Sequence, residues 1–397
     1  MIPGRVVTFP AAGIDGSVQE QTGLLHVPDG PAPAGGRPVV VYGHMTTGGS
    51  LRSAPSIGSP EHPEWRRMSQ GDALCRMLVA RGIAVLRPDY EGIGGPGIHP
   101  YLIGASLAES MHAMVRARAS FDADLGDAWV AAGHSEGAVA ALHASVPSGE
   151  VNGAASSAGA VGAGGAGAGG SGAGASGAGA SGAGASGMSG ADAAGAGASE
   201  VGASGAPVPG AVLLGTAAFA PVTRMDLSIG LSRRIGVRFA GSGVVSALIA
   251  LMLRGAATTD ERMRELIAAD GLGARAAELW PDLDGLCLTE LAAPASWGGL
   301  APGRIGGASG DELFARLAES FRRNEVAALS GFRAPVRIDA ARFDEVAPAP
   351  LTARLLRRYR ADGVELTSAW WPTHHSGTMH PSHAPSRAAA WIAARFS

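Results

Sequence analysis

The sequence contains no lysine, so arginine accounts for all 31 of its Lys and Arg positions. Without lysine the chain has neither the Walker A lysine of phosphate-binding loops nor a lysine that forms Schiff bases or attaches pyridoxal phosphate. The formal net charge is −3. Since there is no basic excess, nothing in the composition indicates binding to nucleic acid or to an anionic membrane.

Cysteines and long apolar runs are also scarce. Cys75 and Cys287 lack the close spacing of metal ligands and would pair only across a long loop, so we expect two free thiols and no metal site. The longest apolar run, residues 243–253, is too short to span a bilayer. The first residues, Met1 to Arg5, show no signal-peptide pattern. We therefore expect a soluble, cytoplasmic protein without integral membrane association.

The stretch 129–142 carries the strongest chemical signal. A short apolar run, a Gly-His-Ser-Glu-Gly turn and a series of small helix-forming residues follow one another, and Gly133, Ser135 and Gly137 fit the pattern G-x-S-x-G. A strand, a sharp turn and a helix are the context that a nucleophile elbow requires. The two glycines suit the close approach of the backbone in such a turn. Ser135 is therefore the candidate nucleophile; the alternative is an ordinary glycine-rich turn with a bystander serine.

Apolar, β-branched runs alternate with amphipathic ones on both sides of this stretch. The expected strands are residues 6–10, 24–27, 37–42, 83–87, 129–132, 209–215, 335–339 and 364–370, and the expected helices are 68–81, 106–120, 351–361 and 385–396. This alternation predicts an α/β fold with a mostly parallel sheet and helices on both faces.

Two segments interrupt the alternation. Residues 148–207 are almost entirely Gly, Ala and Ser and cannot bury enough apolar surface to form a core, so we expect a disordered insert. Helical patterns at 225–239, 243–253, 260–269, 273–279 and 311–324 predict a helical cap, or an ordinary helical subdomain. The expected domains are a core (1–147, continued by a strand at 208–221 and by 334–397), the insert and the cap at 222–333.

A serine nucleophile needs a base to take its proton and an acid to orient that base. In α/β-hydrolases these residues occur in the order Ser, acid, His. Asp344 and His375 obey this order after Ser135, and each follows an expected strand, at the edge where a parallel sheet places catalytic groups. Competing candidates are Asp339 and Glu345 for the acid and His374, His380 and His383 for the base.

Backbone donors for an oxyanion are expected from two places. The loop 43–49 follows a buried strand, and Thr46 or Met45 would donate from it. Glu136, which follows the nucleophile, would supply the second N–H group. A G-x-G-x-x-G match at residues 92–97 raises a dinucleotide site, which we reject because Pro96 lies inside it and no helix follows at once. We expect neither an organic cofactor nor a metal.

Four stretches together resemble the secretory lipase (lipase A-type) family of α/β-hydrolases. They are residues 43–48 (GHMTTG), 89–102 (DYEGIGGPGIHPYL), 133–137 (GHSEG) and 343–348 (FDEVAP). The resemblance implies an α/β-hydrolase fold, a carboxylic ester hydrolase activity and a lipase-like helical lid. Members of the family usually have glycine where this chain has Met45, and they are usually exported.

These observations predict a serine esterase or lipase that works through an acyl-enzyme intermediate on a small-molecule or lipid ester. The apolar cap favours apolar acyl chains. An acyltransferase or a peptidase with the same triad is an alternative, and so is a binding protein that keeps the pocket without turnover. The sequence does not indicate an oligomeric state.

Overall fold

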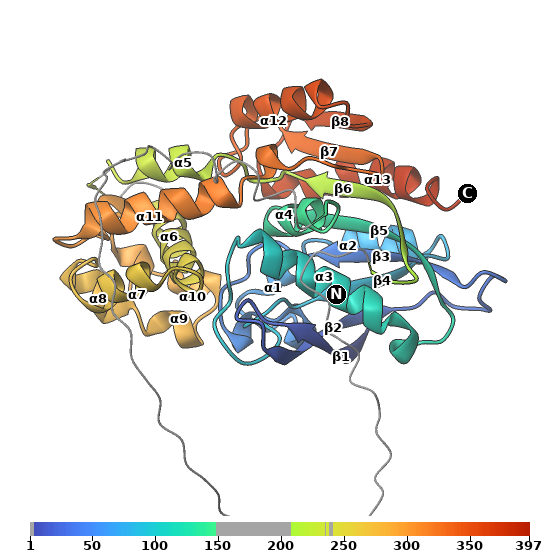
Figure 1. Ribbon diagram of the computed structural model, residues 1–397, viewed down its shortest axis with the longest axis horizontal. Helices are drawn as coiled ribbons and strands as arrows, with labels where there is room; N and C mark the ends of the chain where they lie inside the picture. Colours follow the sequence, from blue (N-terminus) through green and yellow to red (C-terminus); the bar gives the residue numbers. More distant parts are fainter. Residues whose placement is uncertain (1–3, 148–207, 235, 238–240) are drawn as a thin grey trace, which may run out of the picture.

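The computed structural model describes residues 4–147, 208–234, 236–237 and 241–397. Its strands are β1 (Arg5–Ala12), β2 (Val18–His26), β3 (Arg37–Gly43), β4 (Ala84–Pro88), β5 (Leu125–His134), β6 (Val212–Phe219), β7 (Val336–Ala341) and β8 (Leu366–Trp371). They form an 8-stranded sheet in the order β1-β2-β4-β3-β5-β6-β7-β8 (Figure 1). The expected Gly/Ala/Ser insert at 148–207 lies outside the described residues.

The sheet is mostly parallel, as the sequence predicts. Strand β2 runs antiparallel to both β1 and β4, whereas every other neighbouring pair is parallel. The carboxyl ends of parallel strands meet at one edge of a sheet, where ligands and reactive groups bind in such folds. The loops after β3, β5, β7 and β8 therefore open on the same edge, and these four loops carry the candidate residues.

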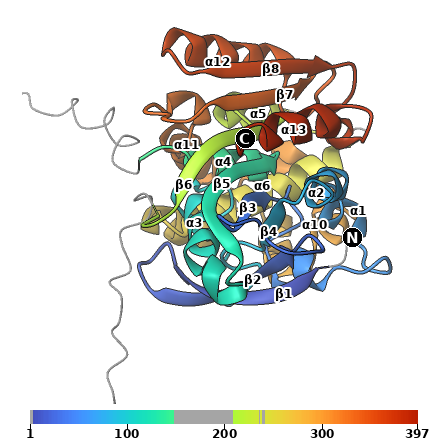
Figure 2. The ribbon, with the colours of Figure 1, turned by 90° about the vertical axis from the view of Figure 1, so that its right-hand side faces the viewer.

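Alternating side chains of the central strands face two layers of helices. Val39 and Val41 of β3 belong to an apolar cluster that includes α3 (Gly104–Phe121), α4 (Glu136–His143) and α12 (Ala349–Ala361). Val40 and Tyr42 point to the other face and pack in a cluster with α2 (Asp72–Val79) and α13 (Ala384–Ala393). Figure 2 shows these helices on both sides of the sheet. Burial on both faces explains why the parallel strands read as continuous apolar runs.

A group of helices lies between β6 and β7 in the chain and to one side of the sheet (Figure 1). The cap, as we call this group, consists of α5 (Met225–Ser232), α6 (Ser242–Ala257), α7 (Glu261–Ala268), α8 (Ala274–Leu279), α9 (Asp282–Gly285), α10 (Leu288–Leu291) and α11 (Gly310–Arg323). Helix α6 is its centre and packs against α7, α10 and α11. This central place explains why the sequence of α6 is apolar nearly all round.

Several boundaries differ from those expected. The expected helix 68–81 is shortened to α2, with a separate helix α1 (Trp65–Met68) before it, and the expected strand 209–215 is shifted to β6 at 212–219. The helix expected at 225–239 ends at Ser232, with residues 235 and 238–240 outside the described part. Helices α9 and α10 have no sequence-based counterpart. Short 3-10 segments are η1 (Leu51–Ser53), η2 (Pro55–Ile57), η3 (Trp297–Gly299), η4 (Pro302–Arg304), η5 (Val326–Ala328) and η6 (Ser376–Met379).

The two cysteines are buried free thiols, as expected. Burial raises the pKa of Cys75 to about 11, so this thiol stays protonated at neutral pH. Among the helices in the described ranges, none combines the length and the apolar character that crossing a membrane would require.

Candidate active site

Ser135 lies at a sharp turn between β5 and α4. Its backbone adopts φ 58° and ψ −113°, which a residue with a side chain rarely does. The Ser135 N–H donates to the carbonyl of Phe219 on β6 at 2.9 Å, so the neighbouring strand holds the turn. Strained backbone of this kind persists only when the surroundings impose it, and it concentrates at functional sites.

Glycines allow three segments of backbone to meet below this turn. A Cβ atom added to Gly133 would lie 2.0 Å from the carbonyl oxygen of Gly137, and one added to Gly137 would lie 2.0 Å from the carbonyl oxygen of Gly43. No real Cβ approaches an oxygen so closely. The glycine spacing of the elbow is therefore explained by contact between β3, β5 and the start of α4.

Asp344 and His375 come together from the loops after β7 and β8. The His375 Nδ1–H group faces both carboxylate oxygens of Asp344 at 2.9 Å, and the two side chains are 3% and 1% exposed. Asp344 Oδ1 also accepts from the backbone N–H groups of Val346, at 2.9 Å, and Ala347, at 2.6 Å. These contacts hold the carboxylate rigidly and fix the proton of His375 on Nδ1, which leaves Nε2 as the basic nitrogen.

Two further side chains hold the backbone of His375, and neither role follows from sequence reasoning. Glu345 accepts from the His375 backbone N–H through Oε2 at 3.1 Å. His134 donates from Nε2 to the His375 carbonyl at 3.3 Å, and the two rings lie 5.0 Å apart. Burial, and then the nearby His375, lowers the pKa of His134 well below its usual value, so His134 stays neutral. Glu345 thus contacts the backbone of His375, whereas Asp344 contacts its ring.

The other candidates for acid and base are engaged elsewhere. Asp339 pairs with Arg337 at 2.7 and 2.9 Å and accepts from the Trp371 indole at 2.9 Å. His380 bonds to Ser382, and His383 donates to the Gly377 carbonyl at 2.7 Å. His374 lines a separate polar pocket with His380. Among these candidates, within the described part of the chain, His375 therefore lines a cavity with Ser135, and Asp344 is the carboxylate that contacts its ring.

Ser135 and His375 open on one cavity of about 380 Å³. The Nε2 atom of His375 is buried and has no hydrogen-bond partner among the described residues. Met45 and Thr46 line the cavity beside the serine, and Arg67 and Glu345 are its charged members. Most of the remaining lining is apolar and comes from the cap, from the loop after the 92–97 segment and from the loops after β6 and β7: Tyr101, Leu102, Val222, Met225, Val244, Val245, Leu248, Met252, Leu288 and Val346.

The loop that carries Met45 and Thr46 is fixed by aromatic side chains. The His44 ring stacks on Tyr90 with centroids 4.3 Å apart, and the Tyr90 hydroxyl donates to the His44 carbonyl at 3.1 Å. Thr46 Oγ1 bonds to the Tyr101 hydroxyl at 2.8 Å. Met45 is not among the residues with positive φ. Its position therefore does not require the conformational freedom of the glycine that the resembled family carries there.

A buried pair involves Glu136, the residue that follows Ser135. Glu136 Oε1 is 2.7 Å from His99 Nε2, and these side chains are 0% and 1% exposed. The other ring nitrogen of His99 donates to the Glu91 carbonyl at 2.8 Å. The pair ties the first residue of α4 to the loop 89–102, so the Glu136 backbone N–H is held beside Ser135. The His-Pro-Tyr run at 99–101 is the sequence signal for this contact.

The segment that matches G-x-G-x-x-G does not open a helix. Residues 91–97 form turns, and the next helix, α3, begins only at Gly104. A dinucleotide site needs the helix N-terminus directly after the glycines. Across the described ranges, no three His, Cys, Asp or Glu side chains gather as a metal site would need.

The sheet order, the strand directions and a serine at the turn between β5 and α4 define an α/β-hydrolase fold. Neither a known family model nor a curated protein sequence matches this chain. Solved structures that share the fold include lipase A of Candida antarctica, with 14% identity, a TM-score of 0.64, and coverage of 93% of this chain and 72% of that one.

Two bacterial structures are similar over more of their length. A hydrolase from Legionella pneumophila has 14% identity and a TM-score of 0.65, covering 98% of this chain and 88% of that one. The rice cell wall degrading esterase LipA from Xanthomonas oryzae, in a ligand-bound form, has 15% identity and a TM-score of 0.58, covering 98% and 86%. At such identities the likeness establishes the fold that the sequence predicts.

Proposed function

We propose that this protein is a serine carboxylic ester hydrolase that acts on esters of apolar acyl chains. One observation carries the proposal: a buried His375 has Asp344 on one ring nitrogen and an unpartnered second nitrogen at the cavity that Ser135 lines. A serine in a strained strand-to-helix turn, a base and an orienting acid are the parts that acyl transfer needs. The similar solved structures of a lipase and an esterase support this choice among the activities of the fold.

In the acylation step, Ser135 Oγ attacks the ester carbonyl carbon while His375 Nε2 takes the hydroxyl proton. The tetrahedral intermediate collapses when the C–O bond to the alcohol breaks and His375 returns the proton to the leaving oxygen. Water then attacks the acyl-enzyme with His375 again as base, and the acid leaves. Asp344 stabilises the imidazolium that forms in each half-reaction and keeps its Nδ1 proton in place.

The negative charge that develops on the ester oxygen needs donors that are already in position. The backbone N–H of Glu136 is one donor, since it follows the nucleophile at the start of α4, where the helix dipole is positive. Thr46, or Met45 beside it, supplies the second from the loop that the His44–Tyr90 stack holds. Donors of this kind are worth about 3–4 kcal/mol each in the transition state.

The cavity favours an apolar acyl group. Its volume of about 380 Å³ lies in the range of small-molecule sites, and its cap side is formed by Val244, Leu248 and Met252 of α6. Cap and core also meet at the loop after β3, where the Leu288 N–H donates to the Thr47 carbonyl at 2.8 Å. The cap thus forms one wall of the proposed acyl site and acts as its lid.

The test is steady-state hydrolysis of p-nitrophenyl esters of graded acyl length, with Ser135→Ala as the control variant. We expect kcat/KM to rise from acetate to medium-chain esters and to disappear in the variant, which should unfold like the parent. Turnover that survives in Ser135→Ala would refute the assignment of the nucleophile. Folded parent protein without turnover on any ester would refute ester hydrolysis.

A further inference from the structure

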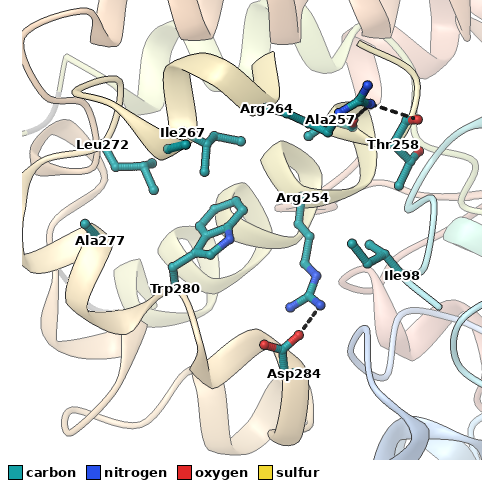
Figure 3. Close-up of a pocket in the computed structure, with 11 residues that line it drawn as sticks. Ile98, Arg254, Ala257, Thr258, Arg264, Ile267, Leu272, Ala277, Trp280 and Asp284 are labelled. Carbon is teal, nitrogen blue, oxygen red and sulfur yellow. Dashed lines mark hydrogen bonds and ion pairs between the residues drawn. The ribbon is translucent and has the colours of Figure 1, made fainter. Parts of the chain in front are cut away.

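The cap contains a second cavity, of about 530 Å³, that shares no lining residue with the Ser135 cavity. It lies among α6, α7, α8 and α9 and reaches Ile98 of the loop 89–102 (Figure 3). Its volume is within the range of sites for small organic molecules. Since it is larger than the Ser135 cavity and contains none of the candidate catalytic residues, it requires its own explanation.

Helix α6 separates the two cavities. Val244, Leu248 and Met252 line the Ser135 cavity, whereas Arg254 and Ala257 line the second one. At 3.6 residues per turn these two sets lie on opposite sides of the helix. The second cavity is therefore not an extension of the proposed acyl site.

Most of the lining of the second cavity is apolar. Trp280 from the α8–α9 region, Ile267 of α7 and Leu272 face the space, and Ile98 at its edge is 44% exposed (Figure 3). An exposed isoleucine and a half-buried tryptophan around a hollow are typical of a surface that an apolar ligand covers. The lining therefore suits an aliphatic chain or a ring.

One cationic side chain in this cavity has spare donors. Arg254 extends between Trp280 and Ile98 and pairs with Asp284 through Nη2 (Figure 3). Its side chain is only 12% exposed, and Nε and Nη1 are buried with no hydrogen-bond partner among the described residues. A buried N–H donor without a partner is costly, and in a native structure it usually has an unseen one.

The remaining charges in the lining leave a single net positive charge. Arg264 directs its Nη1 to the carbonyls of Ala257, at 2.9 Å, and Thr258, at 3.5 Å, and its side chain is exposed. Asp284 balances one of the two arginines. A ligand with one negative charge would complete the balance.

We propose that this cavity binds a monocarboxylate with an apolar body, whose carboxylate is received by the free donors of Arg254. The planar guanidinium matches a carboxylate in shape and hydrogen-bond direction. A phosphate carries more charge and more acceptor oxygens than a carboxylate. Most of these oxygens would face the apolar side chains of Trp280 and Ile267 without a donor. An uncharged ligand would leave the Arg254 donors unpaired.

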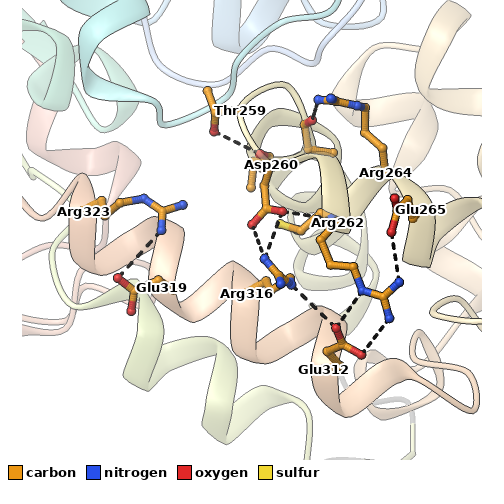
Figure 4. A network of polar contacts seen from close by, with 12 residues as sticks. Thr259, Asp260, Arg262, Arg264, Glu265, Glu312, Arg316, Glu319 and Arg323 are labelled. Atoms are coloured by element: carbon orange, nitrogen blue, oxygen red, sulfur yellow. Dashed lines mark hydrogen bonds and ion pairs between the residues drawn. The ribbon is translucent and has the colours of Figure 1, made fainter. Parts of the chain in front are cut away.

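The walls of the cavity are built in advance of any ligand. Helix α7, which supplies Ile267, is tied to α11 by Arg262 on Glu312, at 2.9 and 3.2 Å, and by Arg316 on Asp260, at 3.2 and 3.1 Å (Figure 4). A preformed site loses less free energy to ordering when it binds. The binding of a small acid therefore does not have to supply the free energy of ordering these walls.

The test is calorimetric titration of the full chain with sodium octanoate, which requires no turnover and so is independent of the proposed hydrolysis. We expect saturable binding that Arg254→Gln weakens about ten-fold or more, because hydrogen bonds to a charged group are lost. Asp284→Asn is the matched control: it removes the same ion pair but leaves Arg254 in place, so we expect octanoate to bind at least as tightly. Leu248→Trp, which fills the Ser135 cavity, should leave this binding unchanged.

Three results would overturn the proposal. Equal loss in Arg254→Gln and Asp284→Asn would show that the ion pair is structural. Loss in Leu248→Trp alone would place octanoate in the Ser135 cavity. If 1-octanol binds as well as octanoate, the site selects only for apolar surface, and if inorganic phosphate does, it selects only for charge. Circular dichroism checks that Arg254→Gln and Asp284→Asn are folded.

Discussion

Replacing Asp344 by asparagine tests the proposed geometry with the removal of one charge and almost no change in shape. Oδ1 accepts from the N–H groups of Val346 and Ala347. In Asp344→Asn the amide oxygen must keep this place, so the NH₂ group takes the position of Oδ2 and faces His375 Nδ1. The amide donates there, the ring proton moves to Nε2, and Nε2 loses the lone pair that accepts the serine proton.

The expected magnitude follows from this change of tautomer. The corresponding aspartate-to-asparagine change in a serine protease triad lowers kcat by about 10⁴-fold. This factor equals about 5 kcal/mol of transition-state stabilisation. Here the two backbone N–H groups hold the asparagine in the unproductive orientation, so we expect a loss of the same order in kcat and little change in KM.

The assay is kcat for p-nitrophenyl octanoate, with Glu345→Gln as the matched control. That variant removes a neighbouring charge in the same loop, but its amide oxygen still accepts from the His375 N–H, so we expect a loss below about ten-fold. If Asp344→Asn retains kcat within ten-fold of the parent, or if the two variants lose the same activity, the assignment of the acid is refuted.

Three further changes test the elbow, a buried histidine and the acyl site. Gly137→Ala places a Cβ 2.0 Å from the Gly43 carbonyl oxygen and should lower the unfolding free energy in urea by about 2 kcal/mol or more; an unchanged midpoint contradicts the packing. Burial lowers the pKa of His143 from 6.5 to about 4, so the stability it contributes is present above pH 6.5 and lost as pH falls. Between pH 7 and pH 5 the free energy of unfolding of His143→Gln should therefore fall by about 2 kcal/mol less than that of the parent, and an equal fall in the two proteins would refute this. Leu248→Trp should lower kcat/KM for decanoate esters about ten-fold while sparing acetate esters, and a uniform loss contradicts the assignment of the acyl wall.

The parts of the fold that depend on local pattern are predictable from the sequence. Strand β3 reads as a buried apolar run because both of its faces are covered, and the elbow is recognisable because its sharp turn tolerates only glycine at positions 133 and 137. The order of Ser135, Asp344 and His375 is informative because parallel strands present their carboxyl ends at one edge.

Features that depend on contacts between distant segments are not predictable in this way. Ala217 and Ala218, which have low strand propensity, are extended because they pair with β5 and β7. Glu345 and Asp344 are neighbouring acids in the sequence. Only the position of the His375 backbone shows that Asp344, and not Glu345, faces the His375 ring. His134 occupies a variable place in G-x-S-x-G, and no local pattern predicts its contact with His375.

The most direct test of the proposed chemistry is the mass of the protein quenched in acid during turnover of p-nitrophenyl octanoate, followed by peptide mapping. We predict one octanoyl group per chain on the peptide that carries Ser135, absent in Ser135→Ala, and accumulating in the parent when deacylation is slower than acylation. Turnover without any adduct on this peptide, or an adduct on another residue, would contradict a covalent mechanism at Ser135.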